Sequence, residues 1–181
     1  MIQLTYFVHA TSIHTEKKIV AGWEGSKLSK LGEIQAKKLG RLTINQNFKI
    51  IFSSDLKRAF DTALIAFSSK YEIIEDKRLR EINAGVYTNS KISDFKKIMK
   101  DHIDIPFPSG ESYNNVKERI SSFIEFLKQN YKNSHVAIVS HNAPQLAFEV
   151  LLNHNSWVET FDNDWRKKGD WQPGWDYWIR E

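Results

Sequence analysis

The sequence predicts an α/β protein in which helices cover both faces of a mostly parallel β-sheet. Short apolar runs of strand length alternate along the chain with longer amphipathic segments of helical periodicity. The strand-like runs are apolar at consecutive positions, which is typical of strands buried on both faces of a sheet. We therefore expect a three-layer α/β/α domain with a mixed, mostly parallel sheet of about five or six strands.

The first strand and the first helix each have a clear local signal. Residues 2–8 form a β-branched and aromatic run that ends at His9, and we expect a buried strand there. The polar stretch 10–27 contains glycine breakers and predicts a long loop. Ser29 is a suitable N-cap for a helix over about 30–42. The expected apolar stripe of this helix is Leu31, Ile34, Leu39 and Leu42.

The middle of the chain continues the alternation. Residues 49–53 predict a second strand, and either Ser54 or Asp55 is expected to cap the helix that follows it. A third strand is expected over 71–74. A basic helix is expected over about 91–100.

The last long helix and the last apolar run lie beyond residue 110. Ser112 is expected to begin a long amphipathic helix, and the run 136–139 predicts a buried strand that ends at Ser140 and His141. Pro144 suits the first turn of a final helix. No repeat or linker interrupts the chain, so we expect a single domain over 1–181.

Composition limits the classes of protein and site. The chain has 181 residues and no cysteine, which excludes disulfides, thiolate catalysis and cysteine-ligated metal sites. The net charge is +4 and the basic residues are spread along the chain, whereas a nucleic-acid-binding protein clusters them. The apolar start lacks the features of a signal peptide, and no run approaches the ~20 apolar residues of a membrane span. We therefore expect a cytoplasmic protein without a nucleic-acid or membrane partner.

The C-terminal segment 157–181 is rich in tryptophan. Five of the six tryptophans lie in it, interleaved with basic residues. Such a pattern could suit single-stranded nucleic acid. We favour the alternative that the segment packs over the core or over an interface between copies of the chain.

Four polar residues fall where the predicted elements begin or end. His9 and His141 each follow directly after an apolar run, and ligands of open α/β sheets bind at the carboxyl ends of strands. Arg58 lies one turn into a helix that follows a strand, a favourable place for an anion. Glu81 adjoins an apolar loop. Any one of these residues alone is more often structural, so the hypothesis of a functional site depends on the whole pattern.

Six short motifs occur around these residues in a fixed order. They are Val8-His9-Ala10-Thr11-Ser12, Leu28-Ser29-Lys30-Leu31-Gly32-Glu33-Ile34-Gln35-Ala36, Ser54-Asp55-Leu56-Lys57-Arg58-Ala59-Phe60-Asp61-Thr62-Ala63, Leu79-Arg80-Glu81-Ile82-Asn83-Ala84-Gly85, Pro108-Ser109-Gly110-Glu111-Ser112 and Val139-Ser140-His141-Asn142. The ordered set, spread over residues 2–152, resembles the histidine phosphatase superfamily, also called phosphoglycerate mutase-like. The resemblance implies the fold of that family, and no motif of the family falls in the tryptophan-rich segment.

The resemblance also implies a mechanism and a role for each residue. His9 attacks phosphorus and forms a phosphohistidine, which water then hydrolyses. Arg58 and His141 hold the phosphoryl oxygens, while Glu81 acts as the general acid for the leaving group and then as the base for water. The implied substrate-binding residues are Thr11, Ser12, Thr15 and Asn142. The substrate is a small phosphorylated molecule, and no metal or other cofactor is expected because cationic side chains supply the positive charge.

Two positions depart from the family's pattern. Val8 stands where the family has an arginine that contacts the phosphoryl group, and Thr15 stands where it has an asparagine. Loss of one such donor commonly costs about 10²–10³ in rate. Another cation, such as Arg80, His14 or a loop lysine, replaces the arginine, or else the protein is a phosphate-binding pseudoenzyme. Retention of all four catalytic candidates favours an active enzyme.

Other functions of the same fold fit less well. Phosphoglycerate mutases of the family are typically longer, with insertions that close over the site, so a mutase is ranked below a phosphatase. The sequence does not decide whether the protein forms a homo-oligomer.

Overall fold

The centre of the protein is a five-stranded sheet in a computed structural model that describes residues 1–168, 171 and 174–180. The strands are β1 (Ile2–Val8), β2 (Ile50–Ser53), β3 (Ile73–Glu75), β4 (His135–Ser140) and β5 (Trp175–Ile179). They lie in the order β3-β2-β4-β1-β5; the first four are parallel, and β5 is antiparallel to β1. The predicted mixed, mostly parallel sheet is confirmed.

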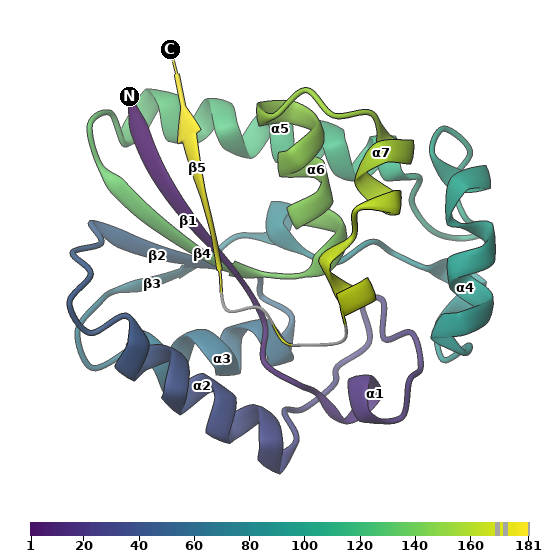
Figure 1. Cartoon of the computed structure of the whole chain (residues 1–181), viewed down its shortest axis with the longest axis horizontal. Helices are drawn as coiled ribbons and strands as arrows, with labels where there is room; N and C mark the ends of the chain where they lie inside the picture. The colour runs from purple at the N-terminus through teal and green to yellow at the C-terminus, as the bar shows by residue number, and fades with distance from the viewer. Residues whose placement is uncertain (169–170, 172–173, 181) are drawn as a thin grey trace.

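Helices cover both faces of this sheet. In the described part of the chain they are α1 (Ile13–Glu16), α2 (Lys30–Leu42), α3 (Lys57–Phe67), α4 (Ile92–Ile98), α5 (Tyr113–Asn130), α6 (Asn142–Leu152) and α7 (Trp157–Asp162). Figure 1 shows α2 and α3 on one face of the sheet and α5 and α6 on the other, while α1, α4 and α7 lie toward the end of the sheet at which β1 finishes. The three-layer prediction is therefore correct.

Each face of the sheet has its own hydrophobic core. On the side of α5 and α6, Tyr6 and Phe52 from the sheet pack with Phe123 and Phe148 from the helices. On the other side, the core of the α2 and α3 layer includes Phe7, Leu39, Ile51, Phe67 and Val139. Neighbouring residues of one strand thus point into different cores, which is why the strands are apolar at consecutive positions.

The register between β1 and β4 brings the two candidate histidines to the same edge of the sheet. Val8 pairs with Ser140, and the amide of His9 donates a hydrogen bond to the carbonyl of Ser140 at 2.9 Å. His141 follows Ser140 directly. Both imidazoles therefore belong to residues at the carboxyl ends of adjacent parallel strands, where open α/β sheets bind ligands.

Several predicted boundaries move by a few residues. The strand expected over 71–74 lies at Ile73–Glu75, and the helix expected over 91–100 is α4 followed by a 3₁₀ turn at Met99–His102. The long loop 10–27 contains the single-turn helix α1. The helix cap predicted at Ser112 is confirmed and forms a capping box.

The predicted cap of α3 is wrong. The N-cap is Leu56, which makes no side-chain capping bond. The hydroxyl of Ser54 bonds His141 at 2.8 Å instead, and the carboxylate of Asp55 pairs with Arg80 at 2.6 Å. Both polar side chains are thus occupied by contacts that organise the sheet edge.

The apolar stripe predicted for α2 is only partly buried. Leu39 is fully buried, but half or more of each other side chain in that stripe is exposed, namely Leu31, Ile34 and Leu42. Gly32 and Ala36 face the protein instead. Gly32 lies against the carbonyl oxygen of Thr11, so close that a Cβ there would overlap it. These small residues therefore let α2 come close to the loop that follows β1.

The tryptophan-rich segment contributes the unpredicted strand β5 and much aromatic packing. Trp157 packs edge-on against Tyr113 with ring centroids 5.3 Å apart. Trp175 packs against Tyr6 at 6.3 Å and against Trp165 at 5.5 Å. These tryptophans lie within or against the core, as the favoured interpretation of the segment predicts.

None of the helices in the described part of the chain is both long and apolar enough to cross a bilayer.

Candidate active site

His9 is held in one tautomer by the backbone that follows it. Its Nδ1 lies 2.7 Å from the carbonyl oxygen of Ala10. Because a carbonyl oxygen can only accept, Nδ1 carries the proton, and Nε2 keeps its lone pair. The Nε–H of Arg58 points at this Nε2 at 3.2 Å.

The surroundings of His9 keep its imidazole neutral. Burial, together with the positive charge of Arg58, lowers the pKa of His9 to about 3. At neutral pH the ring is therefore uncharged. An uncharged imidazole nitrogen that keeps its lone pair is the form that can act as a nucleophile.

Arg58 is buried at the start of α3 and is clamped by two backbone carbonyls. Its Nη2 donates to the oxygen of Gly22 at 2.8 Å, and its Nη1 donates to the oxygen of Glu24 at 3.2 Å. Burial lowers the pKa of Arg58 to about 10, so the guanidinium remains charged at neutral pH. The clamp fixes this charge beside His9.

His141 lies behind His9 and is fully buried, with ring centroids 5.1 Å apart. The hydroxyl of Ser54 accepts a hydrogen bond from the amide of Leu56 at 3.2 Å, and the same oxygen lies 2.8 Å from Nε2 of His141. The hydroxyl donates its own proton to Nε2. Because Nε2 then acts as an acceptor, the ring proton of His141 is on Nδ1. That Nδ1 is buried and has no hydrogen-bond partner within the described part of the chain.

A buried donor without a partner is costly, and an oxygen of a bound anion would relieve it. His141 does not line the cavity described below, so it would act from behind His9. Burial, followed by the charge of Arg58, holds the pKa of His141 well below its usual range. The sequence suggested only a helix cap at Ser54, because the contact of Ser54 with His141 joins residues far apart along the chain.

Glu81 is fixed at the N-terminus of α6. Its Oε1 accepts from the amides of Ile82 at 2.9 Å and Ala143 at 3.0 Å, and its Oε2 accepts from the amide of Asn142 at 3.2 Å. Backbone amides, two of them at the N-terminus of α6, thus hold both oxygens of the Glu81 side chain in place.

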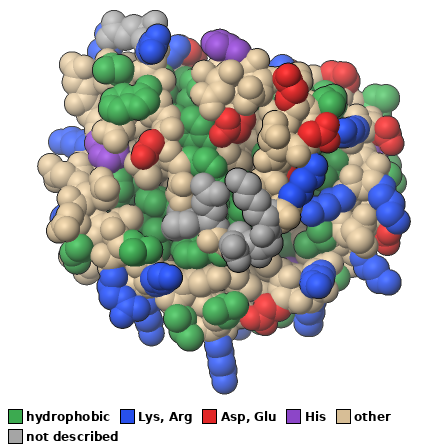
Figure 2. Space-filling model, viewed as in Figure 1, with side chains coloured by type: hydrophobic (Ala, Val, Ile, Leu, Met, Phe, Trp, Pro, Cys, Tyr) green, Lys and Arg blue, Asp and Glu red, His purple; other side chains and the backbone are tan. Residues whose placement is uncertain are grey.

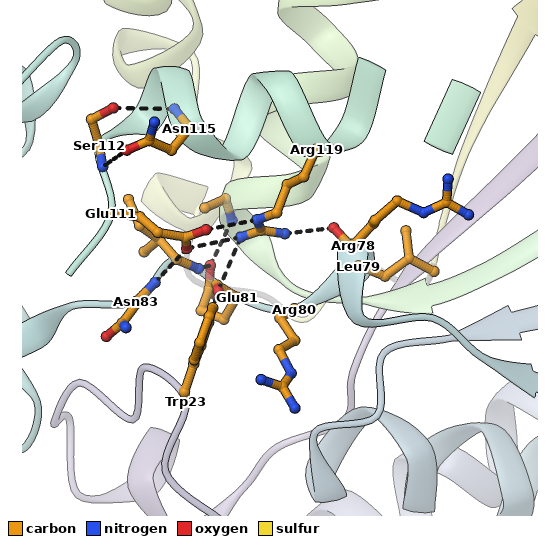
Figure 3. Close-up of polar contacts among 12 residues, drawn as sticks. Trp23, Arg78, Leu79, Arg80, Glu81, Asn83, Glu111, Ser112, Asn115 and Arg119 are labelled. Atoms are coloured by element: carbon orange, nitrogen blue, oxygen red, sulfur yellow. Dashed lines mark hydrogen bonds and ion pairs between the residues drawn. The ribbon is translucent and has the colours of Figure 1, made fainter. Parts of the chain in front are cut away.

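The backbone of Glu81 is held from two further directions (Figure 3). Its carbonyl accepts from Trp23 Nε1 at 2.6 Å and from Arg119 Nη2 at 3.1 Å. Arg119 also pairs with Glu111 at 3.0 Å and donates to the carbonyl of Arg78 at 2.6 Å. The segment that carries Glu81 is thus tied to α5, which restricts the position of the carboxylate.

His9, Arg58 and Glu81 line a common cavity of about 370 Å³. All of the predicted substrate-binding residues line it too, namely Thr11, Ser12, Thr15 and Asn142. Ser12 caps α1 by accepting from the amide of Thr15 at 3.2 Å, and the hydroxyls of these two residues lie 3.0 Å apart. The structure therefore brings together the residues that the sequence selects, with His141 adjoining them.

The cations expected to replace the missing arginine differ in whether they reach the cavity. Arg80 pairs with Asp55 through two hydrogen bonds and stacks over Trp23 at 4.8 Å, and it does not line the cavity. His14 does line it, but its ring nitrogens face Ser26 at 2.9 Å and Asn89 at 3.2 Å. The lysines of the loop 10–27 are absent from the cavity wall.

Part of the cavity wall comes from two segments in which the sequence singled out no site residue. The helix α4 and the turn after it supply Ile92, Phe95, Lys96 and Met99, and the C-terminal segment supplies Trp165, Arg166 and Trp171. Trp171 also donates from Nε1 to the carbonyl of His9 at 3.3 Å. Among the described residues, the lysine and arginine side chains at the cavity are Arg58, Lys96 and Arg166.

Val8 lines the cavity beside His9 and is almost fully buried within the core on the α5 side. The position that carries an arginine in the resembled family is therefore apolar in this site.

Comparison with known proteins gives a consistent result. Over 161 residues the chain is 30% identical to phosphoserine phosphatase 1 of Hydrogenobacter thermophilus, which covers 84% of this chain and 76% of that protein. The fold matches the solved structure of Bacillus stearothermophilus YhfR with a TM-score of 0.79 at 22% identity, over 88% of this chain and 84% of that one. It matches a mycobacterial glucosyl-3-phosphoglycerate phosphatase with a TM-score of 0.76 at 22% identity, over 88% and 86% of the two chains.

Residues 7–161 match the histidine phosphatase superfamily (branch 1), and this stretch includes His9, Arg58, Glu81 and His141. The ordered motifs, the strand-end histidines and the match agree: the chain belongs to the histidine phosphatase superfamily.

Proposed function

We propose that this protein is a phosphatase that hydrolyses a small phosphate monoester through a phosphohistidine at His9. The observation that carries the proposal is the hydrogen bond from His9 Nδ1 to the carbonyl of Ala10, which leaves a neutral Nε2 with its lone pair beside Arg58. Family membership supports the same chemistry. The names of relatives, including phosphoserine phosphatase, support phosphate monoesters as the substrate class.

In the first step, Nε2 of His9 attacks phosphorus, and the bond from phosphorus to the leaving oxygen breaks as the nitrogen–phosphorus bond forms. A protonated Glu81 gives its proton to the departing oxygen, so the product leaves as a neutral alcohol. Arg58 and the free Nδ1–H of His141 stabilise the negative charge on the phosphoryl oxygens.

In the second step, Glu81 takes a proton from water, whose oxygen attacks phosphorus. The nitrogen–phosphorus bond breaks, inorganic phosphate leaves, and His9 returns to its neutral state. The side chains of this chain supply the charge and the proton transfers, and the proposed reaction uses no metal.

The test is hydrolysis of p-nitrophenyl phosphate between pH 4 and pH 9, with EDTA present, by the wild type and by His9→Ala. Turnover in the wild type that His9→Ala abolishes is the expected result. Rapid quench should also trap a phosphoprotein that is labile in acid and stable in base, and His9→Ala should not form it. Full activity of His9→Ala, or loss of wild-type activity on chelation, would reject the proposal.

A pseudoenzyme that binds phosphate is the second candidate, and Val8 is the observation that favours it. If no panel of phosphate monoesters is hydrolysed while vanadate or phosphate still binds, the protein is a binder. The Val8→Arg variant separates the two cases further, because it supplies the missing charge to a site that is otherwise complete. Turnover that appears only in this variant would assign the wild type to the binding class.

A further inference from the structure

Arg166 is presented to the cavity by a rigid pairing with Asp164. Its Nε lies 2.9 Å and its Nη2 lies 2.6 Å from Asp164 Oδ2, and Asp164 is only 6% exposed. Asp164 also accepts from the amide of Arg166 at 3.0 Å. The Nη1 group of Arg166 has no hydrogen-bond partner among the described residues, so one edge of this guanidinium is free to bind an acceptor.

Lys96 lines the same cavity from α4. No residue in the described ranges forms a hydrogen bond or an ion pair with its ammonium group, whereas the next residue, Lys97, pairs with Asp94 at 3.0 Å. Lys100, further along, pairs with Asp162 at 3.0 Å. Lys96 is thus a cation at the cavity without a direct hydrogen-bond or ion-pair partner in the described part of the chain.

Positive charge is concentrated around this part of the cavity. Figure 2 shows Lys and Arg side chains gathered on the side of the molecule that carries α4. Partial burial, together with the positive charges of Arg166 and Lys167, lowers the pKa of Lys96, while Asp164 opposes that shift. Positive charges that act on one another in this way are stabilised by a bound anion.

Lys96 and Arg166 line the cavity close to Glu81, whose charge acts on Arg166. Asn142 connects the two regions, because its backbone amide donates to Glu81 at 3.2 Å while its Nδ2 lies 3.4 Å from Asp164 Oδ1. Glu81 is the proposed proton donor to the leaving oxygen. Arg166, fixed by Asp164, is therefore next to the position of the leaving group and not beside the backbone clamp of Arg58.

We propose that Lys96 and Arg166 bind a second anionic group on the leaving group, so that the preferred substrates are phosphate monoesters that also carry a carboxylate or a second phosphate. This inference rests on the proposed phosphatase function and adds the chemical class of its substrate. A guanidinium edge and an ammonium group form charge-assisted hydrogen bonds with either anion.

The test compares substrates that differ in one anionic group. The pair 3-phosphoglycerate and glycerol 3-phosphate tests a carboxylate, and the pair fructose 1,6-bisphosphate and fructose 6-phosphate tests a second phosphate. We expect kcat/KM to be about ten- to a hundredfold higher for the more anionic member of one pair, the value of a charge-assisted hydrogen bond. The pair that shows this preference identifies the anion.

Lys96→Gln and Arg166→Gln should each remove most of that preference, chiefly by raising KM for the more anionic substrate, and should affect the less anionic member much less. Lys97→Gln is the matched control, because Lys97 is adjacent on α4 and does not line the cavity. Lys96→Arg should retain the preference. The inference is overturned if the wild type shows no preference in either pair, or if the variants slow both members equally.

Calorimetric binding of the same four compounds separates this inference from the proposed function. A protein that hydrolyses none of them can still bind the anionic member more tightly through Lys96 and Arg166, which would support the inference while rejecting the phosphatase. Hydrolysis of an aryl phosphate without any such preference would support the phosphatase and reject the anion pair.

Discussion

The Nε–H of Arg58 points at Nε2 of His9 across 3.2 Å, so the buried cation and the proposed nucleophile share one hydrogen bond. The remaining nitrogens of Arg58 are taken by the carbonyls of Gly22 and Glu24. In this arrangement Arg58 holds the imidazole, and it is in place to turn the same edge toward a phosphoryl oxygen when substrate enters.

Replacing Arg58 by lysine should lower kcat/KM for an aryl phosphate by about 10²–10³, the effect of losing a preorganised donor. One ammonium group cannot reach both carbonyls and His9 together. Steady-state kinetics measures the loss. Lys57→Gln is the control, because Lys57 is exposed and pairs with Asp61 on the surface. Wild-type activity in Arg58→Lys would show that the clamp is unimportant for the reaction.

The buried imidazole of His9 should make the protein less stable in acid. Burial lowers the pKa of His9 to about 3, from an ordinary value of about 6.5. Between these values the unfolded chain binds a proton that the folded protein does not, so the free energy of unfolding falls as pH falls from about 6.5 toward 3. Above this window the contribution is complete.

The His9→Gln variant lacks this proton uptake. Its free energy of unfolding should therefore fall less steeply with decreasing pH, by up to about 1.4 kcal/mol per pH unit. Urea unfolding at pH 7, 6 and 5 measures both slopes. Identical slopes in the two proteins would contradict the neutral, buried state of His9.

Ser54→Ala should impair catalysis, because the tautomer of His141 would no longer be fixed by the hydroxyl. Without the hydroxyl, Nε2 of His141 has no donor and either ring nitrogen can carry the proton. We expect kcat to fall about ten- to a hundredfold, on the scale of one charge-assisted hydrogen bond. The ¹⁵N shifts of the His141 ring report the tautomer directly, and a merely structural effect would not change them.

Ser53→Ala is the matched control for Ser54. Ser53 is also fully buried at the end of β2, but its hydroxyl donates to the carbonyl of Ser54 at 2.9 Å and not to a histidine. If both alanine variants lose the same activity and leave the ring shifts unchanged, the proposed role of Ser54 is wrong.

Gly32→Ala should destabilise the protein and displace the loop that carries Thr11. The new Cβ would overlap the backbone carbonyl of Thr11, so α2 or the loop must shift. Overpacking of this kind costs about 1–3 kcal/mol. Thermal and urea unfolding measure the change, and KM should rise because Thr11 lines the cavity. At Gly25 an added Cβ has open space, so Gly25→Ala should be close to neutral.

Local sequence patterns were sufficient to place the centre of the site. The apolar runs that precede His9 and His141 are strands, and their parallel pairing follows from the common rules for α/β sheets. Arg58 and Glu81 could be selected because each lies near the boundary of an element and within a recognisable motif. Their roles in the reaction remain predictions.

The outer wall of the cavity could not be predicted in the same way. Lys96 and Arg166 are brought together by packing between α4 and the C-terminal segment, and no local periodicity encodes a contact across that separation. The strand β5 was missed for a related reason. Its tryptophans indicate burial, but only the antiparallel pairing with β1 makes the segment a strand. The buried face predicted for α2 was partly wrong, because hydrophobic spacing alone does not show which face of a helix packs against the rest of the protein.

The antiparallel pairing of β5 with β1 also constrains when the site can form during synthesis. The strand that leads to the proposed nucleophile lies between β4 and β5, so both of its neighbours are made more than 120 residues after it. Contacts of such long sequence separation form late, and until then the apolar β1 is an unpaired edge. A ribosome must therefore release residues 175–179 before the nucleophile strand is fully enclosed, and until then the nascent chain is exposed to aggregation through β1.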